Sequence, residues 1–210
     1  MYKKKPLLIT FEGIEGSGKS FQSKKLFKKL KSHGYDVIYT REPGGSLSAE
    51  QIRNVILTGS KNKFLPVTDT LLYLAARNEH INKLIIPLLK KKKIVICDRF
   101  IDSTIAYQVY GKKVNRKFID HIHKHILNGV KPNITFVLKV SPKSSKLRLK
   151  KRKSKNRYDN FPQSFYTKAQ KTFLKLARKG KNYYILDSSS NDINLEKKIF
   201  EIISKRLKIK

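Results

Sequence analysis

The sequence predicts an α/β fold in which helices cover both faces of a parallel sheet, giving three layers. Short apolar runs rich in β-branched and aromatic residues recur along the chain, without the alternation of a half-exposed strand. Helical patterns alternate with these runs, and a glycine-rich turn joins the first run to the first helical pattern. Alternating strands and helices form parallel sheets through right-handed crossover connections.

The elements follow one another in this alternation. Buried strands are predicted at 7–11, 37–40, 94–97, 134–140 and 183–186, and helices at 20–32, 48–57, 68–89, 118–127, 164–179 and 193–207. Ser48-Ala49-Glu50-Gln51 is interpreted as the capping box that starts the second helix. Pro87 is expected to kink or restart the third. The stretch 143–155, mostly Lys, Ser and Arg, is predicted to be mobile.

Length and composition indicate a globular protein with a sizeable core. The chain has 210 residues, of which 39% are hydrophobic, so one domain over 1–210 is expected. A single cysteine excludes a disulfide framework and suits a reducing compartment, the cytoplasm. The basic start precedes an apolar run, 7–11, that is too short for a signal peptide. No run approaches the ~20 residues of a membrane span, so no membrane partner is expected.

The net charge of +33, from 48 basic and 15 acidic residues, attracts polyanions. Lys greatly outnumbers Arg and is scattered from Lys3 to Lys210. Dedicated nucleic-acid binders more often concentrate charge on one face and use Arg for bidentate contacts. Compositional bias with a gain in solubility is therefore favoured over a selected polyanion-binding surface, and no specific nucleic-acid partner is expected.

A phosphate-binding motif follows the first predicted strand. Gly13-Ile14-Glu15-Gly16-Ser17-Gly18-Lys19-Ser20 matches G-x-x-x-x-G-K-[ST] and opens a predicted helix. Glycines let several backbone N–H groups converge on one anion, and the helix N-terminus adds a positive dipole end. Lys19 would reach the β- and γ-phosphates, and the Ser20 hydroxyl would join a Mg²⁺ ion. The alternative, a plain glycine-rich turn, is disfavoured by the strand–helix context.

Asp98 and Arg99 follow the third predicted strand. Ligands of open parallel sheets bind outside the carboxyl ends of the strands, so both side chains are expected at the site. Asp98 would hold Mg²⁺ or its water, and Arg99 would bind a phosphate. The alternative is an ion pair between the two residues.

Longer segments resemble bacterial thymidylate kinases in order and spacing. The segments are 8–19, Thr40-Arg41-Glu42-Pro43-Gly44-Gly45-Ser46, Leu71-Leu72-Tyr73-Leu74-Ala75-Ala76-Arg77 and Asp98-Arg99-Phe100-Ile101-Asp102-Ser103-Thr104-Ile105-Ala106-Tyr107-Gln108. The resemblance implies a P-loop NTPase fold of the nucleoside monophosphate kinase type with a basic lid. It also implies Mg²⁺-dependent transfer of the γ-phosphate of ATP to dTMP, giving dTDP for dTTP synthesis, in a homodimer.

The resemblance also implies roles for single residues. It places Tyr73 on the face of the thymine ring, Arg77 at the thymine O4, and Thr104 and Gln108 at the base. Tyr107 would fill the space of a ribose 2′-OH, and Glu15 would lie near the sugar 3′-OH. Arg53 and Arg99 would clamp the dTMP phosphate. The ATP phosphates would be held by residues 13–20 with Phe21.

The basic lid, about 143–160, is expected to complete the catalytic groups. Bacterial members of the family lack an arginine in the P-loop, as this chain does, and supply basic side chains from the lid. The candidates are Arg148, Arg152 and Arg157, which would act with Lys19, Glu15 and Arg99 on the transferring phosphoryl group. A solvated charge run is the alternative. No general base is needed, because the accepting phosphate oxygen is already anionic.

A few positions depart from the family pattern or suggest other chemistry. Phe21 stands where threonine is common, Tyr73 replaces the more frequent phenylalanine, and Asn156-Arg157-Tyr158-Asp159 replaces Asp-Arg-x-Glu. His121, His123 and His125 suggest a metal site, but residues i and i+2 of a helix point to different faces, so a metal is disfavoured. Cys97 is expected to be a buried strand residue.

Two other functions remain open from the sequence. Another P-loop nucleoside or nucleotide kinase would prefer a different acceptor, for example thymidine over dTMP. An ATP-binding protein of nucleic acids or membrane surfaces would bind DNA tightly at physiological salt, with a steep salt dependence.

Overall fold

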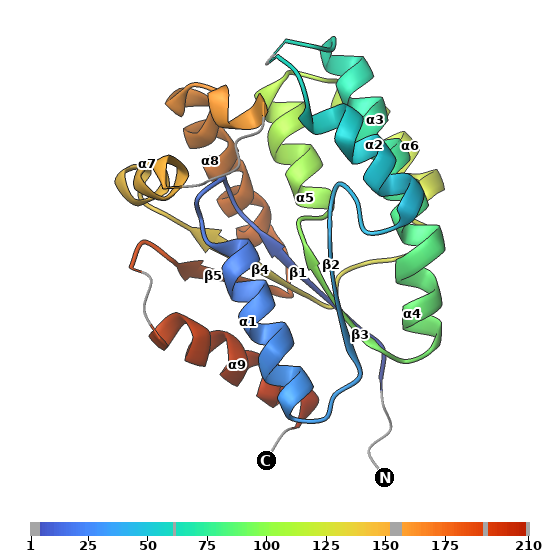
Figure 1. Cartoon of the computed structure of the whole chain (residues 1–210), viewed down its shortest axis with the longest axis vertical. Helices are drawn as coiled ribbons and strands as arrows, with labels where there is room; N and C mark the ends of the chain where they lie inside the picture. The colour runs from blue at the N-terminus through green and yellow to red at the C-terminus, as the bar shows by residue number, and fades with distance from the viewer. Residues whose placement is uncertain (1–4, 61, 152–156, 191–192, 209–210) are drawn as a thin grey trace.

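Five strands form one parallel sheet in the computed structural model, which describes residues 5–60, 62–151, 157–190 and 193–208 (Figure 1). The strands are β1 (Leu7–Glu12), β2 (Val37–Arg41), β3 (Ile94–Asp98), β4 (Ile134–Lys139) and β5 (Tyr183–Asp187). Their order is β2-β3-β1-β4-β5, and every neighbouring pair is parallel. The predicted α/β class and all five predicted strands are confirmed, with ends that differ by one residue.

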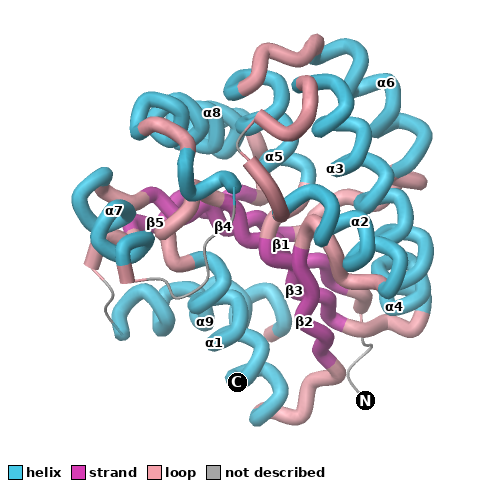
Figure 2. The backbone as a smooth tube through the Cα atoms, turned by 45° about the horizontal axis from the view of Figure 1, so that its top comes forward, coloured by secondary structure: helices cyan, strands magenta, loops and turns pink. Residues whose placement is uncertain are grey.

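Helices cover both faces of the sheet, as Figure 2 shows. On one face lie α1 (Lys19–Ser32) and α9 (Ile193–Leu207), whose buried apolar side chains pack against β1, β3 and β4. The other face is covered by α4 (Ile86–Lys90), α5 (Ile101–Thr104) and α8 (Gln163–Lys179). Along β1, Leu7, Ile9 and Phe11 pack on the face covered by α1 and α9, whereas Leu8 packs on the face covered by α4 and α5. Burial on both faces explains why the strands are continuous apolar runs.

The remaining helices build the rim around the carboxyl ends of the strands. They are α2 (Leu47–Leu57), α3 (Pro66–His80), α6 (Arg116–Ile126) and α7 (Pro142–Lys150). A π-helical segment, Ile105–Gly111, continues α5, and a 3₁₀ turn spans Arg157–Asn160. Across the sheet, Phe11 of β1 and Arg41 of β2 both pair with Asp98 of β3. The segments that follow these three strands therefore meet at one edge.

The long helix predicted at 68–89 is interrupted before Pro87. After α3, residues Ile81–Ile85 form a π-helical turn, and α4 restarts at Ile86 with Pro87 in its first turn. Proline lacks the N–H that an α-helix interior needs, but it is tolerated in the first turn. The expectation of a kink or restart is confirmed.

The predicted capping box is wrong in its position. α2 begins at Leu47 after Ser46, and the Ser46 side chain makes no capping hydrogen bond. Glu50 instead accepts a hydrogen bond from the Gly45 N–H at 2.9 Å. The preceding Gly44 and Gly45 have φ values of 126° and 93°, and this turn places Glu50 beneath the loop rather than beside the first helical N–H groups.

The basic stretch 143–155, predicted to be mobile, is helical as far as Lys150. Ser141 caps α7 by accepting a hydrogen bond from the Ser144 N–H at 3.1 Å, and Pro142 occupies the first turn. Lys, Arg and Leu are good helix formers, so an N-terminal cap is enough to start a helix here. Residues 152–156 lie outside the described residues. Among the described helices, none is both long and apolar enough to cross a membrane.

Candidate active site

A cleft of about 550 Å³ opens at the carboxyl edge of the sheet. Most residues predicted for the site line it, although they come from five segments of the chain. They are Glu15, Gly16, Gly18, Lys19, Ser20, Phe21, Arg53, Tyr73, Arg77, Asp98, Arg99, Thr104, Tyr107, Gln108 and Arg148. Ile14 and Ser17 are buried.

The P-loop between β1 and α1 fits closely against the rest of the cleft. Gly13 has a φ of 144°, and a Cβ there would lie 2.7 Å from the Leu138 carbonyl oxygen. Gly16 has a φ of 73°, and its Cβ would lie 2.7 Å from the Ser145 carbonyl oxygen. Both the conformation and the space require glycine, so the glycines of the motif have a structural reason in this chain.

Lys19 is buried at the floor of the cleft. Its Nζ donates a hydrogen bond to the Ile14 carbonyl oxygen across the P-loop at 3.1 Å. Burial and the nearby charge of Arg99 lower the pKa of the Lys19 ammonium to about 8. Lys19 therefore remains mostly charged at neutral pH, and an incoming anion would offer it a stronger partner than a carbonyl oxygen.

Ser20 and Asp98 form a pair of oxygen donors beside the P-loop. The Ser20 hydroxyl donates to Oδ2 of Asp98, whereas the buried Oδ1 has no hydrogen-bond partner among the described residues. Hard divalent cations such as Mg²⁺ bind a carboxylate or hydroxyl oxygen and keep several waters. The donor set and the unsatisfied carboxylate oxygen fit such an ion.

Arg99 pairs with Glu15, not with Asp98. Its Nη2 donates to Oε1 of Glu15 at 2.7 Å, and the Tyr107 hydroxyl donates to Oε2 of Glu15 at 2.6 Å. Burial opposes ionisation of Glu15, but the charges of Arg99 and Lys19 outweigh it and lower the pKa of this carboxyl. Arg99 adopts a left-handed conformation with a φ of 72°. Such backbone strain is concentrated at functional sites.

Glu12 holds the segment after β3 in place. Its Oε1 accepts from the N–H groups of Phe100 and Ser103 at 2.8 and 3.3 Å, and its Oε2 accepts from the Ser103 hydroxyl at 2.6 Å. Burial, reinforced by the charge of Asp102, raises the pKa of Glu12 to about 7. This buried carboxyl fixes the start of α5 and thereby the direction of Arg99.

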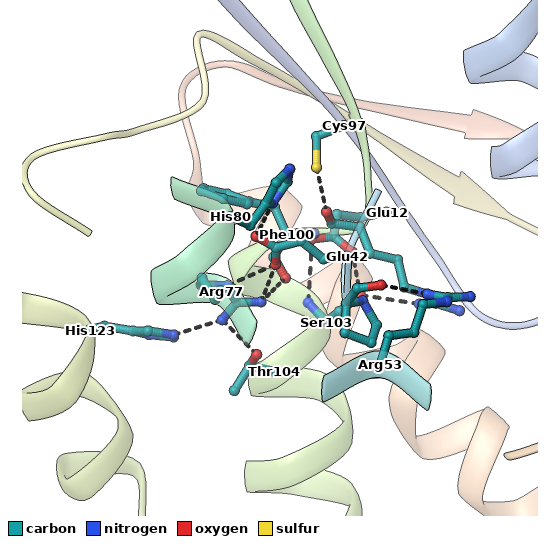
Figure 3. A network of polar contacts seen from close by, with 12 residues as sticks. Glu12, Glu42, Arg53, Arg77, His80, Cys97, Phe100, Ser103, Thr104 and His123 are labelled. Atoms are coloured by element: carbon teal, nitrogen blue, oxygen red, sulfur yellow. Dashed lines mark hydrogen bonds and ion pairs between the residues drawn. The ribbon is translucent and has the colours of Figure 1, made fainter. Parts of the chain in front are cut away.

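Arg77 lies at the centre of a buried polar network (Figure 3). Its Nε donates to Oε2 of Glu42 at 2.8 Å, and Nη2 lies 2.6 Å from the same oxygen. His80 bonds the other Glu42 oxygen through Nδ1 at 3.2 Å. Burial opposes ionisation of Glu42, but Arg77 and the hydrogen bond from His80 lower the pKa of this carboxyl. The network ties α3 to the end of β2.

Three tyrosines form an aromatic wall of the cleft. The ring centroids of Tyr73 and Tyr158 are 6.1 Å apart, and those of Tyr107 and Tyr158 are 6.2 Å apart, both in edge-to-face geometry. Tyr158 is a hydrogen-bond partner of the Tyr73 hydroxyl, and burial raises the pKa of Tyr73. Arg53 also lines the cleft, and its Nη1 donates to the Pro43 carbonyl oxygen at 2.6 Å.

The predicted lid arginines differ in position. Arg148 lines the cleft and donates to the Gly16 carbonyl oxygen at 3.0 Å and to that of Ser188 at 2.6 Å. Arg157 is buried against Asp69 and is not among the residues that line the cleft. Arg152 lies outside the described residues. The structure therefore brings Arg148 to the phosphate-binding loop and Arg157 to α3.

The three predicted metal-candidate histidines separate as expected for a helix. The rings of His121 and His125 lie 4.9 Å apart on the exposed side of α6, whereas His123 is buried beside Arg77. Within the described ranges, no group of three or more His, Cys, Asp and Glu side chains could hold a metal.

Sequence reasoning did not assign a role to Glu12, Glu42 or His123. Glu12 and Glu42 each follow a predicted strand and lie within segments that resemble the family, and these two signals could have indicated them. Their partners lie between 35 and 91 positions away. His123 gave a misleading signal, because it belongs to a run of alternate histidines.

Comparisons with known proteins give a consistent result. A model of the family described as "Thymidylate kinase" matches residues 11–199. A thymidylate kinase of Onion yellows phytoplasma (strain OY-M) is 43% identical over 206 residues, covering 96% of this chain and 97% of the relative. One of Wolbachia pipientis wMel is 46% identical over 176 residues, covering 82% and 86%. The crystal structure of thymidylate kinase from Ehrlichia chaffeensis aligns with a TM-score of 0.77 at 34% identity, covering 95% of this chain and 99% of that chain.

Proposed function

Because this chain belongs to the thymidylate kinase family, we propose that the residues lining its cleft take specific roles in that family's reaction. The chain is a kinase that phosphorylates dTMP to dTDP with ATP. The observation that carries the roles is that the P-loop, the Arg99–Glu15–Tyr107 cluster and Arg77 line one cleft. Two nucleotides can then be held with their phosphates facing each other.

The P-loop, residues 13–20 with Phe21, binds the phosphates of ATP in this proposal. Glycines at positions 13 and 16 let the backbone approach the anion, and Lys19 neutralises the β- and γ-phosphates. Ser20 and Asp98 would hold Mg²⁺, directly or through water, and this ion would neutralise charge on the phosphate oxygens. Phe21 is half-exposed at the mouth of the cleft.

Transfer of the phosphoryl group needs positioning and charge neutralisation. A phosphate oxygen of dTMP forms a bond to the γ-phosphorus while the bond from that phosphorus to the bridging oxygen breaks, leaving ADP. No proton has to be removed from the acceptor. Lys19, Arg99 and Arg148 converge on the P-loop side of the cleft, so they are the cations proposed to stabilise the transferring group. Arg152 stays a prediction, and the contact of Arg157 with Asp69 favours a role in holding the residues around it.

The thymine ring is proposed to lie beside Tyr73, with its edge toward Arg77, Thr104 and Gln108. The Arg77 guanidinium donates to Oγ1 of Thr104 at 2.8 Å, so the hydrogen of the Thr104 hydroxyl is directed elsewhere. Thr104 lines the cleft, where it can donate to a base carbonyl. An amino group, as in cytosine, would meet donors at that position and be rejected.

The sugar and phosphate of dTMP would lie across Glu15. Tyr107 holds one carboxylate oxygen of Glu15 and Arg99 the other, which keeps the carboxylate ionised and fixed. The Tyr107 ring fills space that a ribose 2′-OH would need, and Glu15 would accept from the 3′-OH. Arg53 and Arg99 would clamp the monophosphate from two sides of the cleft.

We further propose that 1–210 is one domain, with 143–160 acting as a lid. Arg148 in α7 reaches the P-loop carbonyls, whereas Arg157 and Tyr158 both contact Asp69 of α3. The lid residues thus connect both sides of the cleft. The cytoplasm remains the location predicted from the sequence.

A homodimer is proposed to form through the face shared by α3 and α6. Val67 and Leu71 of α3 and Phe118 of α6 are 49%, 45% and 36% exposed, and a groove beside them is lined by Val67, Val114 and Phe118. Adjacent exposed apolar side chains on neighbouring helices favour association.

Light scattering is expected to give a mass near twice 24.4 kDa, and Leu71→Arg is expected to halve it. Ile193→Arg on α9 is the control, and a monomeric wild type would contradict the proposal.

The substrate preference is tested by release of ADP with a panel of acceptors. With Mg²⁺ and ATP, dTMP is expected to give the fastest turnover, dCMP at least ~10² times less, and thymidine none, because the site holds an acceptor phosphate and rejects an amino group. Chelating Mg²⁺ is expected to stop turnover with dTMP. Phosphorylation of thymidine in preference to dTMP would contradict the proposed roles.

A further inference from the structure

His123 is a buried side chain that none of the roles above uses. It lies on α6 with 5% of its surface exposed, whereas His121 and His125 on the same helix are exposed. Its Nε2 is 2.8 Å from Nη1 of Arg77 on α3 (Figure 3). Through this side chain α6 contacts the centre of the polar network.

The contact with the Arg77 guanidinium determines which ring nitrogen of His123 carries the proton. A guanidinium has only hydrogens to offer, so Nε2 of His123 has to accept, and the ring proton is then on Nδ1. Burial and the charge of Arg77 lower the pKa of His123 to about 3. The charge of Arg116 acts in the same direction, and these effects together outweigh the opposing charge of Glu42. His123 is a neutral acceptor at any pH at which the enzyme would work.

This contact is one of four hydrogen bonds that hold the Arg77 guanidinium. Nε contacts Glu42, Nη2 contacts Glu42 and the Phe100 carbonyl oxygen, and Nη1 contacts Thr104 and His123. Four of these contacts are hydrogen bonds, and the contact of Nη2 with Glu42 is an ion pair at 2.6 Å. Of the two hydrogens on Nη1, one is accepted by His123, which leaves the other for Thr104.

We infer that His123 is a positioning residue for recognition of the thymine base. By accepting one hydrogen of Nη1, it sets the rotation of the Arg77 guanidinium and keeps the hydroxyl of Thr104 an acceptor toward Arg77. The hydrogen of Thr104 is then directed away from Arg77, toward the cleft that Thr104 lines. The inference rests on the proposed placement of the base beside Arg77 and Thr104.

Loss of the acceptor has a direct consequence. A buried N–H of Arg77 would be left unpaired, at a cost that corresponds to a roughly 5- to 150-fold change in an equilibrium constant. The guanidinium relieves this cost by turning toward Thr104 or by drawing in water. Either change competes with the base for the same groups, so binding of dTMP weakens while binding of ATP on the P-loop side does not.

The test compares His123→Leu, which keeps the bulk and removes the acceptor, with His123→Gln, whose amide oxygen can replace Nε2. His125→Leu, an exposed position on the same helix, is the control. His123→Leu is expected to raise KM for dTMP by about 10-fold, with kcat and KM for ATP within about 2-fold. His123→Gln is expected to restore KM for dTMP to within about 3-fold, and His125→Leu to leave all three constants unchanged.

Further measurements separate this inference from the proposed site and from a structural role. In an Arg77→Lys background, which removes the planar guanidinium, His123→Leu is expected to add no further change in KM for dTMP. An unchanged KM for dTMP in His123→Leu, or equal losses for both substrates, would overturn the inference. An unchanged KM for dTMP in Arg77→Lys alone would overturn the placement of the base instead.

The wild-type protein supplies a test that does not depend on the folding of a variant. The ¹⁵N chemical shifts of the His123 ring report which nitrogen carries the proton. We expect the Nδ1–H form with Nε2 as acceptor between pH 6 and 8, both with and without dTMP. A protonated ring, or the Nε2–H form, would rule out the acceptor role of His123.

Discussion

Replacing Lys19 with alanine is expected to abolish phosphoryl transfer while the fold is retained. Lys19 is the only lysine of the P-loop motif, residues 13–20. Its ammonium group donates a hydrogen bond to the Ile14 carbonyl oxygen, and water can replace this donor in the variant. Removing a preorganised cation from the transferring phosphates costs at least about 3–4 kcal/mol, or a 10²- to 10³-fold fall in kcat. ADP release with saturating ATP and dTMP measures this loss.

Lys28→Ala, on the exposed side of the same helix, is the matched control and is expected to keep wild-type kcat. Melting temperatures of both variants should stay within a few degrees of the wild type. Lys19 makes one internal hydrogen bond, and the lowered pKa shows that burial of its charge is unfavourable, so its removal costs little stability. Near-native turnover by Lys19→Ala would refute the assignment of the P-loop as the triphosphate site.

Replacing Arg77 with alanine is expected to damage the use of dTMP far more than the binding of ATP. Arg77 is buried and holds Thr104, Glu42 and the Phe100 carbonyl oxygen together on the acceptor side of the cleft. We expect kcat/KM for dTMP to fall by at least ~10²-fold, while the dissociation constant of ATP changes by less than about 3-fold. A selective loss of ATP affinity would reject the base-reading role.

Stability has to be measured alongside, because Arg77→Ala leaves the buried Glu42 carboxylate with a hydrogen bond to His80 but without its guanidinium partner. Breaking a buried pair costs about 3–5 kcal/mol, so the melting temperature is expected to fall. Arg77→Lys keeps the charge and is expected to lose dTMP use with a smaller loss of stability. Arg116→Ala, which removes an exposed ion pair with Asp120, is the control and is expected to change neither property.

The strands and the P-loop could be predicted because their signals are local. Each strand is buried on both faces, so it appears as an unbroken apolar run, and the run 94–97 differs from β3 only by its last residue, Asp98. The restart of the helix at Pro87 was predictable for the same kind of reason, since the missing N–H is a property of that residue alone. The family motifs made most residues that line the cleft predictable as well.

The start of one predicted helix and two whole helices were not predictable from local patterns. Ser48 was assigned as the cap of α2, but the turn at Gly44 and Gly45 moves the start to Leu47. For α7, the basic composition that follows Ser141 is typical of loops, although the Ser141 side chain caps a helix. The helix at 101–111, α5 with its π-helical continuation, was not assigned, although it carries Thr104, Tyr107 and Gln108.

The sequence alone determined the five strands, most of the helices and the phosphate-binding loop, because burial and glycine spacing are properties of consecutive residues, and the family motifs indicated most residues that line the cleft. Only the tertiary structure decided which side chains meet: Arg99 with Glu15, Arg77 with Glu42 and His123, and Arg157 with Asp69. These partners lie 35 to 88 positions apart. Their contacts depend on how helices and strand ends pack around the sheet, and no local pattern records that.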